Sequence, residues 1–192
     1  MFNGNGYSAE WVKEAKRRGL PNITNTVDSL AMMTDKAYVD IFERFGVFTQ
    51  AEIESRKEIY LETYSKQINI EAGIMVEMAK RLIVPASTRY MQEILNSVAS
   101  QSELGLEPTA QKALISDLSE HINATLTITD NLEKKMLEAH AMDGDTLAQA
   151  ENYRSVVIPV MDNLREHVDT LERLTDKAYW PYPSYEDMLF HL

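Results

Sequence analysis

Residues 49–100 read TQAEIESRKEIYLETYSKQINIEAGIMVEMAKRLIVPASTRYMQEILNSVAS, with one glycine, Gly73, and one proline, Pro85. The opening Thr-Gln-Ala-Glu is a capping-box pattern, which satisfies free N–H groups at the start of a helix. Proline cannot donate the i→i−4 hydrogen bond, so a helix must kink or stop there. We favour a kink, because the helical spacing continues from Tyr90 to Val98. Apolar residues before the proline recur at steps of three, four and seven, which is typical of a helix and not of a strand; they are Ile53, Tyr60, Tyr64, Ile68, Met75, Met78 and Leu82.

Two further long helices are predicted after residue 107. Pro108 suits a first helical position, and a heptad-like pattern runs from there to about residue 142. A second apolar pattern covers residues 146–179 and should bend at Pro159. The turn between them, residues 143–145, is so short that the two helices must lie antiparallel. The sequence therefore predicts an all-α fold, an antiparallel bundle of three long helices over residues 49–179, kinked near Pro85 and Pro159.

Short helices are expected in residues 1–48. Ser8 should cap a helix that ends at Arg18 before a left-handed Gly19. Thr34 should cap another that ends at Gly46, with one apolar face formed by Ala37, Ile41 and Phe45.

An aromatic tail, residues 180–192, should leave the last helix as an extended strap, since residues before proline favour extended backbone. Ser184 is then a candidate cap for a final helical turn. The tail either covers its own bundle or docks on another domain or subunit. The candidate interdomain or subunit contacts are Trp11, Trp180, Tyr182, Tyr185 and Phe190. We expect residues 1–192 to form one helical domain.

Composition excludes several classes of function. The net charge of −11 repels phosphate backbones, so no nucleic-acid partner is expected. The absence of cysteine rules out disulfides and thiol catalysis and suits a cytoplasmic protein. No signal-peptide pattern is present, and no apolar run approaches the ~18 residues of a membrane span.

No catalytic, cofactor-binding or metal-binding residue can be assigned. A di-metal site in a helical bundle needs Glu-x-x-His, and leucine or methionine stands three residues before each of His121, His140, His167 and His191. Asp117 and His121 could form a metal clip, but a surface salt bridge is the preferred interpretation. Glu71 and Glu77 are expected to form structural ion pairs with Lys80, Arg81 or Arg89.

Three stretches together resemble a known family. They are FNGNGYSAEW at 2–11, INIEAGIMVEMA at 68–79 continuing into IVPASTRY at 83–90, and YWPYPSYEDMLF at 179–190. They are similar, in the same order, to the C-terminal helical domain of type III glutamine synthetases, and the resemblance covers essentially the whole chain.

The resemblance implies a non-catalytic domain of an oligomeric ligase. The parent enzyme would join ammonia to glutamate with ATP and Mg²⁺ or Mn²⁺, in catalytic domains upstream of this segment. This segment alone is then expected to be inactive, to lack cofactors, and to contact the catalytic domain and neighbouring subunits for assembly, stability or regulation. The turn-forming start at residues 1–6 agrees with a piece of a longer chain. The alternative is a stand-alone helical-bundle interaction or sensor module.

Overall fold

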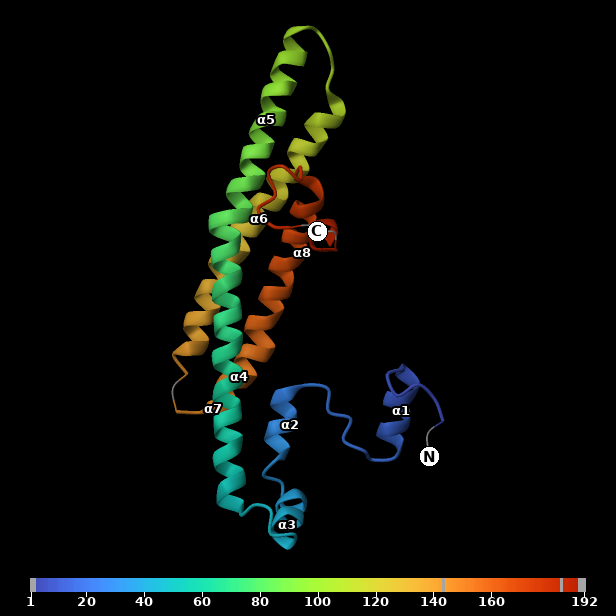
Figure 1. Ribbon diagram of the computed structural model, residues 1–192, viewed down its shortest axis with the longest axis vertical. Coiled ribbons are helices and arrows are strands. Elements are labelled where there is room, and N and C mark those ends of the chain that lie inside the picture. Colours follow the sequence, from blue (N-terminus) through green and yellow to red (C-terminus); the bar gives the residue numbers. More distant parts are fainter. Residues whose placement is uncertain (1–2, 143, 184, 190–192) are drawn as a thin grey trace. The chain divides into compact units, whose positions relative to one another are not determined.

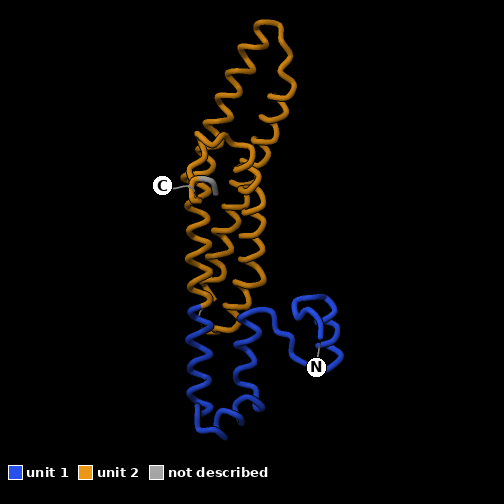
Figure 2. The backbone as a smooth tube through the Cα atoms, turned by 45° about the vertical axis from the view of Figure 1, so that its right-hand side comes forward, with its two compact units in different colours: residues 1–63 blue, residues 64–192 orange. Residues whose placement is uncertain are grey.

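The protein is built from helices alone over the residues that its computed structural model describes, 3–142, 144–183 and 185–189 (Figure 1). The all-α prediction is confirmed. The backbone forms two compact units, residues 1–63 and 64–192, whose boundary falls inside a helix (Figure 2). The single-domain organisation stays a prediction. The elements are α1 (Ala9–Arg17), α2 (Thr26–Met32), α3 (Lys36–Arg44), α4 (Gln50–Met78), η1 (Ala79–Ile83), α5 (Val84–Glu103), α6 (Thr109–His140), α7 (Thr146–Asn152), η2 (Tyr153–Val157), α8 (Ile158–Leu174) and α9 (Tyr185–Leu189).

The first short helix begins and ends as predicted. Ser8 Oγ accepts a hydrogen bond from the Trp11 N–H at 3.3 Å, which satisfies one free donor of the first turn of α1. Gly19 follows the helix with φ +67°, the left-handed conformation that glycine adopts without a Cβ penalty. Trp11 is half-buried and Ala15 is fully buried.

The third helix differs from its prediction in its cap and its buried face. The N-cap of α3 is Asp35, not Thr34. Ile41 and Phe45, two members of the predicted apolar face, are 53% and 74% exposed, whereas Val39 is buried. A nine-residue helix turns only two and a half times. Two apolar stripes therefore fit its pattern, and spacing alone cannot choose between them.

The predicted capping box at the start of α4 is confirmed. Glu52 Oε2 accepts from the Thr49 N–H at 2.8 Å, and Thr49 Oγ1 accepts from the Glu52 N–H at 3.4 Å. The backbone and hydroxyl hydrogen bonds from Thr49 lower the pKa of the Glu52 carboxyl, because they favour its charged form.

The buried seam of α4, η1 and α5 lies about one residue away from the predicted stripe. Tyr60 and Leu82 were predicted to be inside but are 47% and 43% exposed. The prediction favoured large side chains and overlooked alanine, which is among the residues most often fully buried. Four of the buried positions are spaced eleven residues apart, close to three helical turns, at Leu61, Ala72, Ile83 and Ile94. The others are Ile53, which belongs to the predicted stripe, and Ser65, Ala79, Ala86 and Ser87.

Both prolines of the long helices are accommodated by π-helical turns. The Val84 N–H donates to the Ala79 carbonyl, one residue beyond the α-helical partner, just before Pro85. Ile158 likewise donates to Tyr153 just before Pro159. Proline lacks the N–H and clashes with the carbonyl four residues back, and the wider turn relieves both problems. Helical winding continues through both sites, so the helices do not break there.

The core of the second unit is built on heptads. The heptad pattern predicted for α6 is confirmed, although Pro108 is the N-cap and not the first helical residue. The helix α6 packs against α5 and α8. Buried residues seven positions apart on α6 are Leu118, Thr125, Leu132 and Ala139, and those on α7, η2 and α8 are Ala150, Val157, Leu164 and Leu171.

The last long helix ends at Leu174, earlier than the predicted Tyr179. Thr175 adopts an extended backbone with ψ 133°. Its buried hydroxyl lies 3.1 Å from the buried Ser87 hydroxyl on α5, and this polar contact fixes the point where the chain leaves the helix. Within the described residues, no helix combines the length and the apolar character needed to cross a membrane.

Candidate functional site

Lys80 and Arg81 near Pro85 form structural ion pairs, whereas Glu71, which was expected to pair in the same way, accepts a hydrogen bond from Gln67 at 3.0 Å. Arg81 Nη1 lies 2.7 Å from Glu77 Oε1, one of the predicted pairings. Lys80 Nζ instead reaches α6, at 2.8 Å from Asp130 Oδ1 and 2.6 Å from Glu133 Oε2. Hydrogen bonds to these carboxylates raise the pKa of Lys80. Over residues 3–142, 144–183 and 185–189, no three histidine, aspartate or glutamate side chains gather closely enough to hold a metal ion.

His121 on α6 and His167 on α8 face each other. Their Nδ1 atoms lie 2.9 Å apart, and their half-buried rings have centroids 5.1 Å apart. His121 therefore meets His167 and not the predicted Asp117. The sequence did not suggest this pair, because its members are 46 positions apart. The one available signal is that each histidine follows a buried heptad leucine by three residues, His121 after Leu118 and His167 after Leu164.

Aromatic side chains after α8 pack on the second unit. Trp180 and Tyr182 contact the buried cluster that includes Leu118, and their rings meet edge to face at 6.3 Å. The Tyr182 hydroxyl is buried and has no hydrogen-bond partner among the residues that the structure describes. Burial raises the pKa of Tyr182. These contacts favour the interpretation in which the tail covers its own helices.

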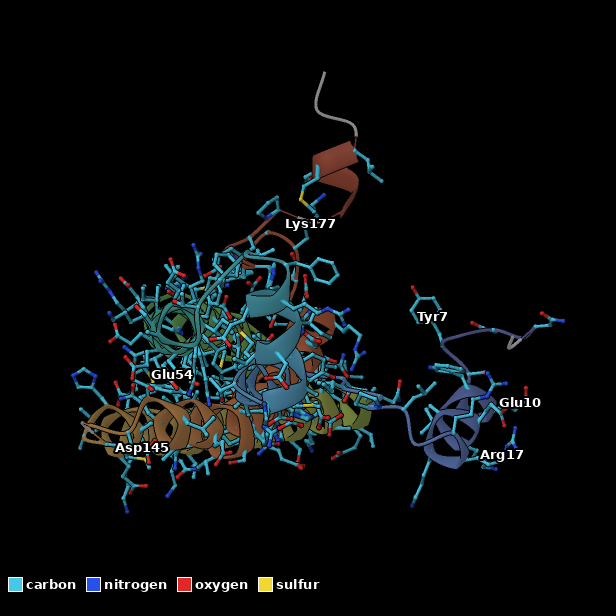
Figure 3. The ribbon with its side chains drawn as sticks, turned by 90° about the horizontal axis from the view of Figure 1, so that it is seen from below. Tyr7, Glu10, Arg17, Glu54, Asp145 and Lys177 are labelled. Carbon is cyan, nitrogen blue, oxygen red and sulfur yellow. The ribbon has the colours of Figure 1, made fainter. Side chains whose placement is uncertain are left out.

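Two polar contacts fix the same segment. The Tyr179 hydroxyl donates to Glu93 on α5, and this hydrogen bond raises the pKa of Tyr179. Lys177 Nζ lies 2.8 Å from Asp187 Oδ1 on α9 (Lys177 is labelled in Figure 3). Residues on both sides of the proline-containing stretch are therefore held by side-chain contacts.

The other predicted contact residues lie in different places. Trp11 is part of α1 in the first unit, and Tyr185 is the first residue of α9. Phe190 and the predicted cap Ser184 lie outside the described residues. Near Trp11, Tyr7 is fully exposed, and Figure 3 shows it projecting from the segment that carries α1.

Exposed aliphatic side chains form an apolar face on α4 and η1, which we call the α4 face (Ile70, Ile74 and Leu82). Their exposed fractions are 61%, 52% and 43%. Ile74 and Leu82 line one shallow groove of about 300 Å³, together with Glu77 and Arg81. Single exposed aliphatic residues are ordinary, but neighbouring ones on one helix face are typical of a contact surface.

The chain resembles glutamine synthetases over its whole length. A family model described as "Glutamine synthetase C-terminal domain" matches residues 1–102. The glutamine synthetase of Butyrivibrio fibrisolvens is 36% identical over an alignment that covers 100% of this chain and 28% of the relative. The glutamine synthetase of Bacteroides fragilis is 31% identical, with 98% of this chain and 27% of the relative covered. The type-3 glutamine synthetase of Dictyostelium discoideum is 31% identical, with 99% and 26% covered. The chain thus spans little more than a quarter of the length of these relatives.

Proposed function

Because this chain belongs to the glutamine synthetase C-terminal domain family, we propose that it is a non-catalytic helical domain that serves the assembly of a type III glutamine synthetase. The observation that carries the proposal is the match to synthetases along the whole chain, with about a quarter of each relative covered. The parent enzyme would join ammonia to glutamate, and it would do so as a cytoplasmic homo-oligomer.

The proposed architecture is an antiparallel bundle of three long helices in a single domain. The three are α4 with η1 and α5, then α6, then α7 with η2 and α8. The contacts of α6 with α5 and α8, and the buried heptads on α6 and α8, support this arrangement. A bundle with matched seams provides a rigid support on which contact surfaces can be held.

The α4 face is the first proposed contact surface. Its three aliphatic side chains are exposed, whereas the residues of α4 and η1 that pack inward are others, such as Leu61, Ala72 and Ile83. Glu77 and Arg81, which pair beside the groove, would form a polar edge around an apolar centre. An apolar centre with a polar rim is the usual composition of a protein–protein interface. We propose that the rest of the synthetase, or a neighbouring subunit, covers this face.

The aromatic tail of the second unit is the second proposed contact surface, and Trp11 of the first unit is a separate third candidate. Trp180 and Tyr182 are half-buried against their own helices, which leaves part of each ring accessible. Tryptophan and tyrosine are enriched at interfaces because they bury a large rigid area and keep a polar group. Tyr185 and Phe190 stay in this proposal as further candidates.

ATP and the divalent metal would belong to the part of the enzyme outside this chain. The described residues contain no group of three metal-ligating side chains. The Asp and Glu side chains near Pro85 are engaged by Lys80 and Arg81. Because the chain aligns with only about a quarter of each relative, we assign no step of the ligase reaction to these residues, and we expect the 192-residue chain to form no glutamine from glutamate, ammonia and ATP. Glutamine formation by the purified chain would contradict this assignment.

The assembly role is tested with charged substitutions in a complete synthetase that carries this domain. Ile70→Glu with Ile74→Glu should lower the oligomer mass in mass photometry, because two carboxylates would be desolvated at the contact. The matched control is Leu104→Glu with Leu106→Glu, which places the same two charges at leucines that are 79% and 54% exposed just after the end of α5. Deletion of the residues after Tyr179 tests the second surface in the same way. An unchanged oligomer mass in both experiments would refute the proposal.

A further inference from the structure

Only one proton can lie between the Nδ1 atoms of the two facing imidazoles of the second unit. A distance of 2.9 Å between the Nδ1 atoms of His121 and His167 is that of a hydrogen bond. A neutral imidazole carries a proton on one nitrogen and a lone pair on the other. One ring must therefore donate from Nδ1 while the other accepts at Nδ1, so the two histidines are different tautomers.

Among the described residues around the pair, the hydrogen bond between His121 and His167 is the polar contact that joins α6 to α8. Leu118 and Leu171 are fully buried beside the pair. None of the described ionisable groups on the surrounding elements makes a hydrogen bond or ion pair with either ring; Arg165 pairs with Asp169 at 3.5 Å, Arg81 with Glu77, and Glu93 with Tyr179. Within four positions of the two histidines, the ionisable residues are Asp117 and Glu120 on α6 and Arg165, Glu166 and Asp169 on α8. Those on the neighbouring segments include Arg89 and Glu93 on α5, Arg81 on η1, and Tyr179 and Tyr182 after α8.

We propose that His121 and His167 form a proton-operated latch between α6 and α8, closed while at most one ring is charged and open when both are. The first added proton binds Nε2 of the donor ring, and the charged donor keeps its hydrogen bond. The second must bind Nδ1 of the acceptor, which removes the lone pair and breaks the bond. Two positive rings with centroids 5.1 Å apart then repel each other.

The direction of the pH effect follows from proton counting. At low pH the unfolded chain binds both extra protons, whereas the latched chain binds one. The unfolded state thus holds one proton more, and stability falls as the pH falls. The loss approaches tenfold in the folded-to-unfolded ratio for each pH unit. Histidine is the side chain whose unperturbed charge change falls between pH 5 and 8, and the measurements below are made within that range. This property is independent of the proposed assembly role.

The test compares urea unfolding of the 192-residue chain from pH 7.5 to 5.0 with that of His167→Gln. A glutamine can form a hydrogen bond with His121 but binds no proton. For each unit by which the pH falls, the folded-to-unfolded ratio should therefore drop by up to tenfold more in the wild type than in the variant. His140→Gln is the matched control, since it removes an exposed histidine from the same helix α6 and should leave the wild-type slope unchanged. His121→Gln serves as the second variant.

Imidazole ¹⁵N spectra of the wild-type chain give a readout that needs no variant. At pH 8 they should show one Nδ1 protonated and the other bare, and at pH 5 both protonated. Two bare Nδ1 atoms at pH 8, or equal pH slopes in the wild type and both glutamine variants, would overturn the proposal. Zn²⁺ titration tests whether the two histidines bind a metal ion instead. If the wild type binds one equivalent of Zn²⁺ and His167→Gln binds none, the pair is a metal site and the latch proposal is overturned.

Discussion

Ser87→Ala removes one half of a hydrogen bond that is buried on both sides. The Ser87 and Thr175 hydroxyls lie 3.1 Å apart, and the two residues are 0% and 6% exposed. The substitution leaves the Thr175 hydroxyl buried without its partner, which should cost about 1–3 kcal/mol of unfolding free energy. Adding Thr175→Val removes the stranded hydroxyl at nearly constant volume. The double variant should then be close to wild type, because replacing both partners of a buried hydrogen bond is nearly neutral.

The measurement is a double-mutant cycle by urea unfolding of the wild type, the two single variants and the double variant. If each single variant costs about 1–3 kcal/mol and the double variant is close to wild type, the coupling energy is the sum of the two single costs, about 2–6 kcal/mol. Ser100→Ala is the matched control, since it makes the same change at an exposed position of α5 and should stay within about 0.5 kcal/mol of wild type. The reasoning is refuted if Ser87→Ala behaves like this control, or if the double variant equals the sum of the single ones.

Three other predictions concern the core and two ionisable groups. Leu132→Ala should cost about 2–5 kcal/mol in urea unfolding because Leu132 is fully buried, whereas Leu137→Ala on the same helix, at a 71% exposed residue, should change little; similar losses would contradict the described core. Burial raises the pKa of Tyr153 above 10.0, so the folded chain keeps the phenol proton longer than the unfolded chain does, and stability should fall as the pH rises beyond 10. Tyr153→Phe should lessen that alkaline loss between pH 9 and 11, and an unchanged slope would count against it. Hydrogen bonds from Arg17 and Arg18 lower the pKa of Glu14 to about 2. The stability that these hydrogen bonds contribute should be fully present above pH 4.5 and disappear as the pH falls through about 2. A carboxyl ¹³C titration of Glu14 with a midpoint near 4.5 would contradict this.

The caps of α1 and α4 could be predicted because their signals are local. Ser8, Gly19 and the pair Thr49–Glu52 each act within one helical turn, and the structure shows the hydrogen bonds and the dihedral angle that their chemistry requires. The heptads of α6 and α8 were visible because large aliphatic residues recur on one face. The burial of Ala72 was not, because the hydrophobicity of alanine is too weak to reveal which face approaches a neighbour.

Features that join distant parts of the chain were beyond prediction. The pairing of His121 with His167 depends on the relative height of α6 and α8, which no local pattern records. The same holds for Lys80, which the sequence suggested would pair on its own helix and which instead bonds to Asp130 on α6. The contact role of Trp11 and the tail stays a prediction, because it concerns surfaces that lie outside this chain.

The π-helical turns bear on the chain length that each helix tolerates. Each turn holds a backbone hydrogen bond that skips one residue more than in an α-helix, at Ala79–Val84 and at Tyr153–Ile158. Because the wider turn absorbs one extra residue, deleting a residue from it restores ordinary winding and leaves the rest of the helix in nearly the same orientation. A deletion in the α-helical part of α5 before Ile94 would instead rotate the later residues by about 100° and carry Ile94 away from the cluster that it shares with Leu118. The long helices should therefore lose a residue at these turns with less change to the buried face than elsewhere along their length.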